Sequence, residues 1–384
     1  MSHYFDANAT TPLLPEARAA WLEAVDDCWH NPSSPTRAAA RVMALLEAAR
    51  EGIAGYFGAA PERVVFNSGA TEGNRDVLAY LRRIEPTKRM LMSAVEHPSV
   101  RENARAIFGP DAREVTVDAL GRLELAALEE ALSAGGVSLV SLLAASNETG
   151  VIQPWREVLA VCRRHGAALH LDATQWVGKE DLAGLAEADF VTVSGHKFGG
   201  PKGAGWLIVS PAFTGFTGQR GGAQEHDHRA GTENYPAIAA MRAALAASEA
   251  TRAANHAQCA AARDNFEAQL IASMPGVRIW GQGAPRLANT SSVCLPVGEN
   301  MRWVRRLDAQ GFLVSTGSAC ATGKAGPSHV LAAMGATDDE ARRTVRVSSL
   351  PTTSGDEWGA LASAMISLLP GMGDDGSNSQ VISI

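Results

Sequence analysis

Short apolar segments alternate with longer amphipathic or Ala-rich segments over the first 250 residues of this 384-residue chain. The short segments are typical of buried strands, and the longer ones have the length and periodicity of helices. We expect strands at 64–66, 90–93, 114–117, 137–143, 168–171 and 190–194, and the first helices at 15–29 and 36–57. Strands separated by helices form a mainly parallel sheet that is covered on both faces. The pattern therefore predicts an α/β fold whose ligands bind beyond the carboxyl ends of the strands.

The pattern changes near residue 251. A long Ala-rich helix is expected from Pro236 to Ser273, followed by strands at 277–280 and 291–295, a helix near 301–310, and a final strand–helix unit. We therefore expect a large domain over residues 12–250 and a smaller domain over residues 1–11 and 251–370. Residues 371–384 are rich in Gly, Asp and Ser, and we expect a flexible tail there.

Composition excludes several classes of function. The net charge of −7 and the pI near 5.8 give no electrostatic reason to expect nucleic acid or an anionic membrane as partner. The N-terminus lacks the basic and apolar stretches of a secretory signal, and no apolar run is long enough to span a bilayer, so we expect a cytoplasmic protein.

The five cysteines are scattered, odd in number and without a CxxC pair, a pattern that fits neither a zinc site nor a disulfide framework. Four of them lie in apolar or helical contexts and are expected to be buried thiols: Cys28, Cys162, Cys259 and Cys294. The alternating residues 226–228 (His-Asp-His) fit a polar loop better than a set of metal ligands, so no metal is predicted.

Two charged residues follow predicted strands in the second half of the large domain. Lys197 comes directly after the strand at 190–194, and Asp172 ends the strand before it. A pyridoxal-phosphate enzyme needs such a pair, because its lysine bonds to the cofactor and its aspartate keeps the ring nitrogen protonated. Taken singly, Lys197 fits a solvated loop residue and Asp172 fits a helix N-cap.

Residues 68–71 (Ser-Gly-Ala-Thr) follow the first strand and open a helix. The free amides at a helix start, with a Thr hydroxyl beside them, are suited to binding a phosphate group. An ordinary helix cap has the same sequence, so the phosphate site depends on its combination with the aspartate and the lysine.

In these residues the chain resembles the cysteine desulfurases of the nitrogen-fixation and iron–sulfur-cluster type. These enzymes belong to the class V aminotransferase group of fold-type I pyridoxal-phosphate enzymes. The resemblance extends from Phe5 to about Ser348 and is carried by residues 5–12, 68–72, 96–100, 147–150, 172–175, 194–197, 229–234 and 318–320, in that order. It implies a mainly parallel seven-stranded sheet between helices, followed by a smaller α+β C-terminal domain.

The resemblance also implies how the cofactor is bound. Lys197 would carry the pyridoxal phosphate and move the proton at Cα. His97 would stack on the ring and also shuttle protons, whereas a lone histidine at this position fits an ordinary helix-start residue. Asp172 would pair with the ring nitrogen, and Gln175 would hydrogen-bond to the ring oxygen. The implied phosphate ligands are Ala70 (through its amide), Thr71, Ser194, His196 and, from the neighbouring subunit of a homodimer, Thr232.

The substrate implied by the resemblance is L-cysteine. Asn147 and Arg346 would hold its carboxylate, for which a bidentate arginine is well suited; with Arg342 and Arg343 nearby, Arg346 also fits a surface cation. Cys320 lies in the small, polar segment 315–326, where we expect an exposed and mobile thiol.

The resemblance implies that the Cys320 thiolate attacks the substrate sulfur, becomes a persulfide and passes sulfur to an acceptor such as an iron–sulfur scaffold, while alanine is released. Three alternatives share the same cofactor residues or partners: another class V aminotransferase, a selenocysteine lyase, and a scaffold protein without turnover. Two segments depart from the family pattern, residues 73–76 and residues 347–351.

Overall fold

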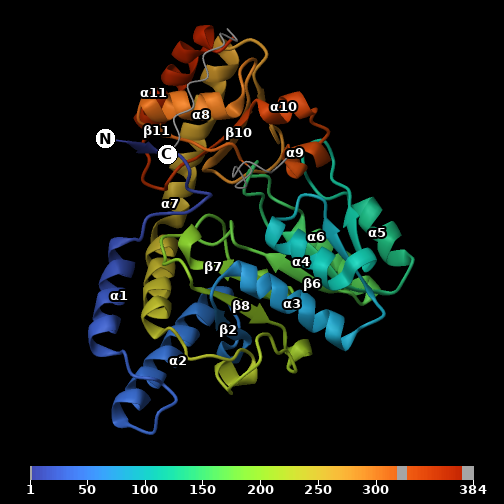
Figure 1. The fold of residues 1–384 in the computed structure, drawn as a ribbon, viewed down its shortest axis with the longest axis vertical. Helices are drawn as coiled ribbons and strands as arrows, with labels where there is room; N and C mark the ends of the chain where they lie inside the picture. Colours follow the sequence, from blue (N-terminus) through green and yellow to red (C-terminus); the bar gives the residue numbers. More distant parts are fainter. Residues whose placement is uncertain (1, 318–326, 374–384) are drawn as a thin grey trace.

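A seven-stranded sheet forms the centre of the protein in a computed structural model that describes residues 2–317 and 327–373 (Figure 1). Its strands are β2 (Val64–Asn67), β3 (Arg89–Ser93), β4 (Ala112–Val115), β5 (Val137–Leu143), β6 (Ala168–Asp172), β7 (Phe190–Ser194) and β8 (Gly205–Val209). Their order is β2-β8-β7-β6-β5-β3-β4, and only the β2–β8 and β8–β7 pairs are antiparallel. The predicted α/β fold with a mainly parallel sheet is therefore confirmed.

Helices cover both faces of this sheet. They are α1 (Pro15–Asp27), α2 (Arg37–Phe57), α3 (Ala70–Ile84), α4 (Pro98–Phe108), α5 (Leu125–Ser133), α6 (Trp155–His165) and the 39-residue α7 (Tyr235–Ser273). Side chains of α3 and α4 pack on one face, and side chains of α1, α2, α5, α6 and α7 pack on the other. Alternate residues of one strand serve opposite faces, as Leu139 and Val140 do in β5.

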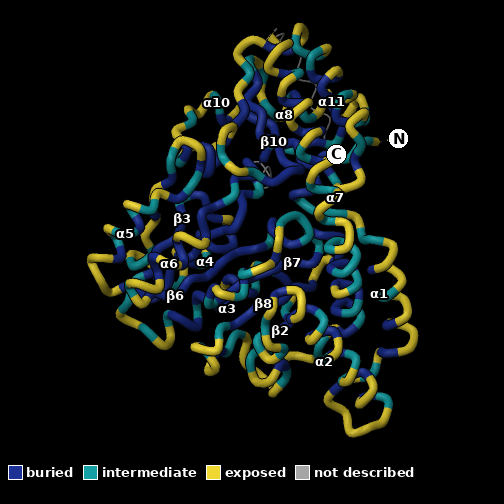
Figure 2. Tube along the Cα trace, turned by 180° about the vertical axis from the view of Figure 1, so that it is seen from behind, coloured by how far each residue is buried: buried dark blue, intermediate teal, exposed yellow. Residues whose placement is uncertain are grey.

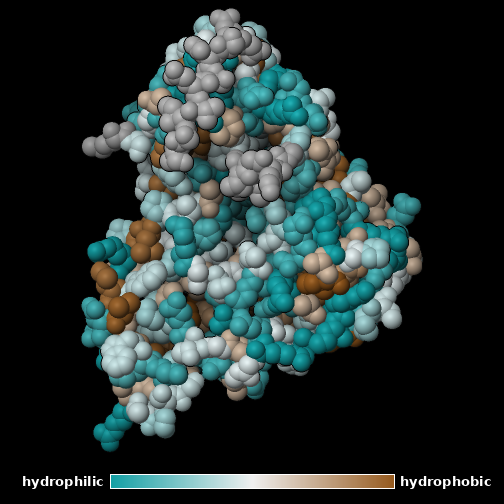
Figure 3. Space-filling model, viewed as in Figure 1, coloured by the Kyte–Doolittle hydropathy of each residue, from teal (hydrophilic) through white to brown (hydrophobic). Residues whose placement is uncertain are grey.

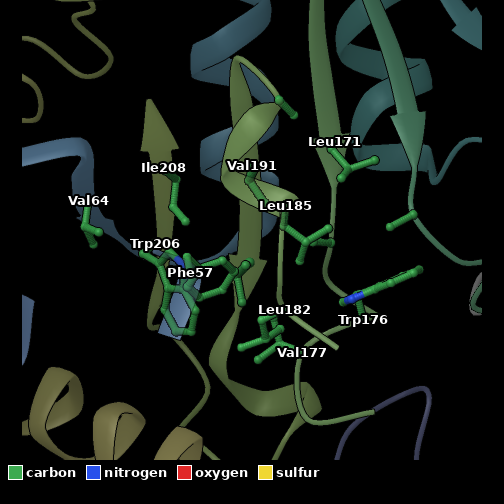
Figure 4. Close-up of a cluster of buried hydrophobic side chains, with 14 of the residues drawn as sticks. Phe57, Val64, Leu171, Trp176, Val177, Leu182, Leu185, Val191, Trp206 and Ile208 are labelled. Atoms are coloured by element: carbon green, nitrogen blue, oxygen red, sulfur yellow. The ribbon is translucent and has the colours of Figure 1, made fainter. Parts of the chain in front are cut away.

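The hydrophobic cluster on the α1, α2, α5, α6 and α7 side of the sheet combines aliphatic side chains with aromatic ones such as Phe57, Trp176 and Trp206 (Figure 4). Trp206 of β8 is fully buried and makes an edge contact with Phe57 at the end of α2. The α2 helix is fixed at both ends, since Thr36 accepts a hydrogen bond from the amide of Ala39 and Gly58 adopts the left-handed conformation that ends the helix. Figure 2 shows the strands as a continuous buried layer inside a partly exposed helical shell.

A second, smaller group of elements follows α7. Its antiparallel sheet has the order β12-β10-β9, and its short parallel sheet pairs β1 with β11. The bounds are β1 (His3–Tyr4), β9 (Arg278–Ile279), β10 (Thr290–Cys294), β11 (Phe312–Leu313), β12 (Thr344–Ser348), α8 (Asn300–Ala309), α9 (His329–Ala333), α10 (Asp338–Arg342) and α11 (Gly355–Leu368). Their core includes Phe5 from the N-terminal segment and Phe266 from the second half of α7.

The predicted domain boundary at residues 250/251 stays a prediction, because α7 runs through it without a break. Strand β8 is missing from the sequence-based expectation, although its five residues are apolar or Gly. None of the helices within the described ranges is both long and apolar enough to cross a bilayer. The face in Figure 3 is mostly hydrophilic, with an apolar group at its left edge over α1, where Leu22 and Val25 are exposed.

Candidate active site

A cavity of about 440 Å³ lies where the carboxyl ends of the central strands meet the second group of elements. It is lined by Asn8, Ala9, Ser68, Gly69, Ala70, Thr71, Glu72, His97, Ser99, Leu143, Ala145, Asn147, Asp172, Thr174, Gln175, Ser194, His196, Lys197, Lys202, Gly203 and Arg346. Asp172 ends β6, and Lys197 follows the adjacent parallel strand β7. Because parallel strands end at the same edge of a sheet, the two side chains reach one cavity.

The amine of Lys197 is held by the N-terminal segment. Its Nζ donates to the backbone carbonyl oxygens of Asn8 and Ala9, at 2.7 Å each. Burial, with a smaller contribution from the positive charge of Arg346, lowers the pKa of Lys197 to about 8. A lysine with a lowered pKa has more of the free amine that attacks carbonyl groups near neutral pH.

Asp172 is buried and both of its oxygens are occupied. Its Oδ2 accepts from Nδ2 of Asn74 at 2.9 Å, and its Oδ1 accepts from the amide of Thr174 at 3.0 Å. Asn74 Nδ2 also donates to Ser99 Oγ at 2.9 Å. The carboxylate is therefore fixed in direction, as required for pairing with one particular nitrogen.

His97 is the N-cap of α4 and lines the same cavity. The amide of Ser99 donates to His97 Nδ1 at 3.1 Å, which leaves the proton of the neutral ring on Nε2. Burial lowers the pKa of His97; the charge of Asp172 raises it to a smaller extent, and the charge of Lys197 lowers it further. The ring is therefore neutral near pH 7 and has an N–H to donate.

The start of α3 forms an anion-binding cup. Gly69 precedes the helix with φ of 133°, and a Cβ at this position would lie 3.2 Å from Ser194 Oγ. The first amides of a helix have no intrahelical acceptor, and they carry the positive end of the helix dipole. Thr71 and Lys202 add a hydroxyl and a positive charge to the lining of the cup.

His196 completes the cup as a neutral side chain. Burial and the nearby charges of Lys197 and Lys202 lower its pKa to about 4. Its Nδ1 contacts Thr10 Oγ1 at 3.1 Å. The free amides at the start of α3, the hydroxyl of Thr71, the neutral ring of His196 and the charge of Lys202 together suit a phosphate group.

Arg346 of β12 is buried, so the alternative of a surface cation is wrong. Its Nη2 pairs with Asp6 Oδ1 at 2.6 Å, and its Nη1 donates to the carbonyl oxygens of Asn147 and Gly317, at 3.1 Å each. Its buried Nε has no hydrogen-bond partner among the described residues. Arg346 lines the cavity, and the bonds of its Nη atoms fix the direction of its guanidinium, which suits it to bind a carboxylate.

The altered segment after Arg346 holds the N-terminal segment in place. Ser348 Oγ accepts from the amide of Asn8 at 3.0 Å, and the Ser348 amide donates to the carbonyl oxygen of Phe5 at 2.9 Å. Asn8 in turn supplies one of the carbonyl oxygens that hold Lys197. The departure from the family pattern therefore falls on residues that support the lysine.

A buried network of polar side chains lies near Asp172. Glu96 accepts from Ser141 Oγ at 3.2 Å, Ser141 contacts His170 Nδ1 at 2.9 Å, and His170 Nε2 contacts Thr192 Oγ1 at 2.9 Å. Burial, and then the charge of Asp172, raise the pKa of Glu96 to about 8. Glu96 is thus largely protonated at neutral pH, which avoids a second negative charge beside Asp172.

The structure brings together most of the residues predicted from the sequence. Ten of them line the cavity: Ala70, Thr71, His97, Asn147, Asp172, Gln175, Ser194, His196, Lys197 and Arg346. Thr232 is exposed and lies outside this lining, and Cys320 falls outside the described residues. Sequence reasoning missed Asn8, Asn74 and Lys202; for Asn74, the available signal was its position one turn after Ala70 on the same helix.

The cavity fits pyridoxal phosphate. It offers an amine, a fixed carboxylate, an anion cup and a neutral ring, and the buried hydroxyl of Thr174 in its wall has no partner among the described residues. Lys197 would hold the aldehyde carbon, Asp172 the ring nitrogen, and the start of α3 the phosphate. When bound, this cofactor supplies a protonated ring that takes up negative charge from the α-carbon of an amino acid.

Comparisons with known proteins agree with this chemistry. Residues 3–357 match the class-V aminotransferase family. A cysteine desulfurase of Cereibacter sphaeroides is 38% identical over 342 residues, covering 86% of each chain. A solved NifS-like protein superposes with a TM-score of 0.89 at 28% identity, covering 97% of this chain and 100% of that one. A protein named SspA, solved in complex with cysteine, has a TM-score of 0.78 at 30% identity, covering 92% and 100%.

Proposed function

Because the chain belongs to the class-V aminotransferase family and, within it, to the NifS-type cysteine desulfurases, we propose that it uses pyridoxal phosphate to convert L-cysteine to L-alanine. The observation that carries this proposal is the shared cavity of Lys197, Asp172, Arg346 and the start of α3. Lys197 supplies the amine that the reaction requires. Asp172 is suited to bind the ring nitrogen of the cofactor, Arg346 the carboxylate of the substrate, and the start of α3 the phosphate.

Each residue of the cavity has a defined task in the proposed reaction. Arg346, held in direction by its contacts with Asn147 and Asp6, binds the substrate carboxylate. Lys197 removes and returns the proton at Cα, because an amine with a pKa near 8 can act as base and acid near neutral pH. The three-carbon fragment that remains after sulfur leaves takes a proton from the Lys197 ammonium, and the neutral ring of His97 can hydrogen-bond to it through Nε2–H.

We propose Cys320 as the sulfur nucleophile. Its thiol first loses a proton, and the thiolate then attacks the substrate sulfur. The C–S bond of the substrate breaks as the S–S bond forms, so that Cys320 gains one sulfur atom and alanine forms after protonation. Gly317, three positions before Cys320, supports this role because its carbonyl oxygen is bonded to Arg346 at the cavity. Three residues span up to about 10 Å.

Mass spectrometry tests the proposal directly. The purified chain, loaded with pyridoxal phosphate and incubated with L-cysteine, should release alanine and gain the mass of one sulfur atom on the peptide that contains Cys320. Cys320→Ser should lose both signals and keep the visible absorption of the bound cofactor. The matched control Cys28→Ala, which removes a buried cysteine at the end of α1, should keep both signals. Alanine formation by Cys320→Ser would contradict the role of Cys320.

We further propose a homodimer in which Thr232 contacts the phosphate in the neighbouring subunit. This proposal is supported by the exposure of Thr232 and by the pair between Arg229 Nε and Glu72 Oε1, at 2.8 Å, which holds the Thr232 segment beside the anion cup. Mixed dimers test it, because one chain with Lys197→Ala and one with Thr232→Val can form only one intact site. If Thr232 acts across the interface, the intact Lys197 and intact Thr232 belong to different chains, and the mixed dimer recovers about half of the wild-type activity. Full inactivity of the mixed dimer would contradict this arrangement.

The acceptor of the sulfur and the cytoplasmic location also belong to this proposal. A persulfide on Cys320 is suited to transfer to a thiol of another protein, such as an iron–sulfur scaffold. Radiolabelled cysteine tests this step: label should move from the isolated persulfidated enzyme to an added scaffold protein, and not to a scaffold whose cysteines have been alkylated.

A further inference from the structure

A second lysine, Lys179, lies beside the cofactor residues without a task in the proposed reaction. It belongs to the turn that follows β6, and its Nζ donates to Gln175 Oε1 at 2.5 Å and to Asn8 Oδ1 at 3.2 Å. Burial, followed by the charges of Lys197 and Arg346, lowers the pKa of Lys179 to about 7. Placing an amine among two other cations is costly, so its position calls for a reason.

The contacts of Gln175 supply that reason. An amide side chain has one oxygen that accepts and one nitrogen that donates, and rotation by half a turn exchanges them. In this structure Oε1 accepts from Lys179, and Nε2 donates to the backbone carbonyl oxygen of Asn8 at 2.9 Å. Lys179 therefore fixes the side-chain oxygen of Gln175 directly. It also hydrogen-bonds to Asn8 Oδ1, and the backbone carbonyl oxygen of Asn8 accepts from Gln175 Nε2.

We propose that Lys179 is a positioning residue for the cofactor: it fixes the amide of Gln175 so that an N–H group, and not the amide oxygen, faces the phenolic oxygen of the ring. This inference depends on the proposed cofactor site. It extends that site to a residue that lies outside the cavity lining and acts only through Gln175.

Gln175 and Lys179 line two neighbouring cavities and so lie on opposite sides of the wall between them. Gln175 lines the cavity of about 440 Å³, whereas Lys179 lines a neighbouring cavity of about 520 Å³ whose lining does not include Gln175. The hydrogen bond from Lys179 to Gln175 therefore passes between the two cavities. Space on the Lys179 side means that a longer cation there, as in Lys179→Arg, can keep the bond without entering the cofactor cavity.

The expected effect has a definite sign. An N–H donor stabilises negative charge on the phenolic oxygen, and the oxygen shares a proton with the nitrogen through which the cofactor is attached to Lys197. Without that donor, the phenolic oxygen and the attachment nitrogen would lose their shared proton only at a higher pH. In Lys179→Met the pH midpoint of the visible absorption of the bound cofactor should therefore rise, by about one pH unit or a tenfold change in proton affinity.

A double-mutant cycle separates this role from a general structural one. Lys179→Met should raise the midpoint in the wild-type background and leave it unchanged in a Gln175→Ala background, because the amide to be oriented is then absent. Lys179→Arg should restore the wild-type midpoint to within about 0.3 pH unit, as it keeps the donor. Thermal unfolding of each apo-protein, measured alongside, reports changes in folding separately from the absorption.

Three results would overturn the inference. They are an unchanged midpoint in Lys179→Met, an equal shift in the Gln175→Ala background, and failure of Lys179→Arg to restore the midpoint. A wild-type chain that binds pyridoxal phosphate while Lys179→Met shows no shift would refute only the role of Lys179. A wild-type chain without visible absorption would refute the cofactor site itself, and this role with it.

Discussion

The position of Lys197 should destabilise the apo-protein, and the effect should depend on pH. Burial and the charge of Arg346 lower the pKa of Lys197 from its ordinary value of about 10.5 to about 8. That difference corresponds to about 3 kcal/mol in favour of the unfolded chain when both forms are protonated. Replacement of Lys197 by Met removes this cost, and also removes the hydrogen bonds to the carbonyl oxygens of Asn8 and Ala9, which contribute about 1 kcal/mol each. At pH 7 the variant should therefore be more stable by about 1 kcal/mol.

The stability difference between Lys197→Met and the wild type changes sign at high pH. Between pH of about 8 and about 10.5 the unfolded chain binds a proton that Lys197 has released in the native state, so the stability of the wild type rises with pH across this window. Above it both forms are neutral, the electrostatic cost is absent, and only the lost hydrogen bonds remain. The variant should then be less stable than the wild type by about 2 kcal/mol.

Urea unfolding of the two apo-proteins at several pH values between about 7 and 10.5 measures this difference. The control is Lys202→Met, which removes an exposed lysine from the same Gly-rich loop and should not reproduce the crossover. A stability difference between the wild type and Lys197→Met that stays constant with pH would refute the reasoning, since it would mean that the buried amine carries no electrostatic cost.

Three further predictions concern other parts of the molecule. Gly69→Ala should weaken pyridoxal-phosphate binding at least tenfold in a fluorescence titration, because Gly69 has φ of 133° and the new Cβ would lie 3.2 Å from Ser194 Oγ; wild-type affinity would contradict the phosphate cup. Arg50→Met should lower the free energy of unfolding by about 3–5 kcal/mol in urea, because it leaves the buried Glu225 without the partner at 2.7 Å, and a loss below about 1 kcal/mol would show that the pair contributes little. A native-state thiol label should react mainly at Cys320 and at all five cysteines only in urea, since the other four are buried; rapid labelling of a second thiol without urea would contradict this.

The sequence was sufficient to predict the fold class and to place Asp172 and Lys197 in one site. Strands that are apolar throughout and separated by helices indicate a parallel sheet, and the ends of two such strands place Asp172 and Lys197 together without knowledge of other contacts. Strand β8 was missed because it follows the Gly-rich loop at 199–203, which indicates irregular structure, and because it runs antiparallel to β7 with no α-helix between the two strands.

Two of the residues missed at the site, Asn8 and Asn74, act through contacts between distant parts of the chain. Asn8 reaches Lys197 from 189 positions away, and Asn74 reaches Asp172 from 98 positions away. Helical periodicity shows that Asn74 shares a face with Ala70, but it does not show what that face meets. For Arg346 the charged neighbours suggested exposure, whereas all five residues of β12 are buried and Arg346 pairs with Asp6.

The length of α7 has a mechanical consequence. The helix contains 39 residues and so spans about 58 Å, and after Pro236 it has no Gly or Pro at which to bend. Its first half packs on the layers around Lys197, and its second half packs on the core that carries β12 and Arg346. As a stiff rod it would turn a tilt of about 5° at one end into a movement of about 5 Å at the other. Helix α7 therefore joins the part of the fold that carries Lys197 to the part that carries Arg346, and a tilt of the whole helix would change the distance between these two residues.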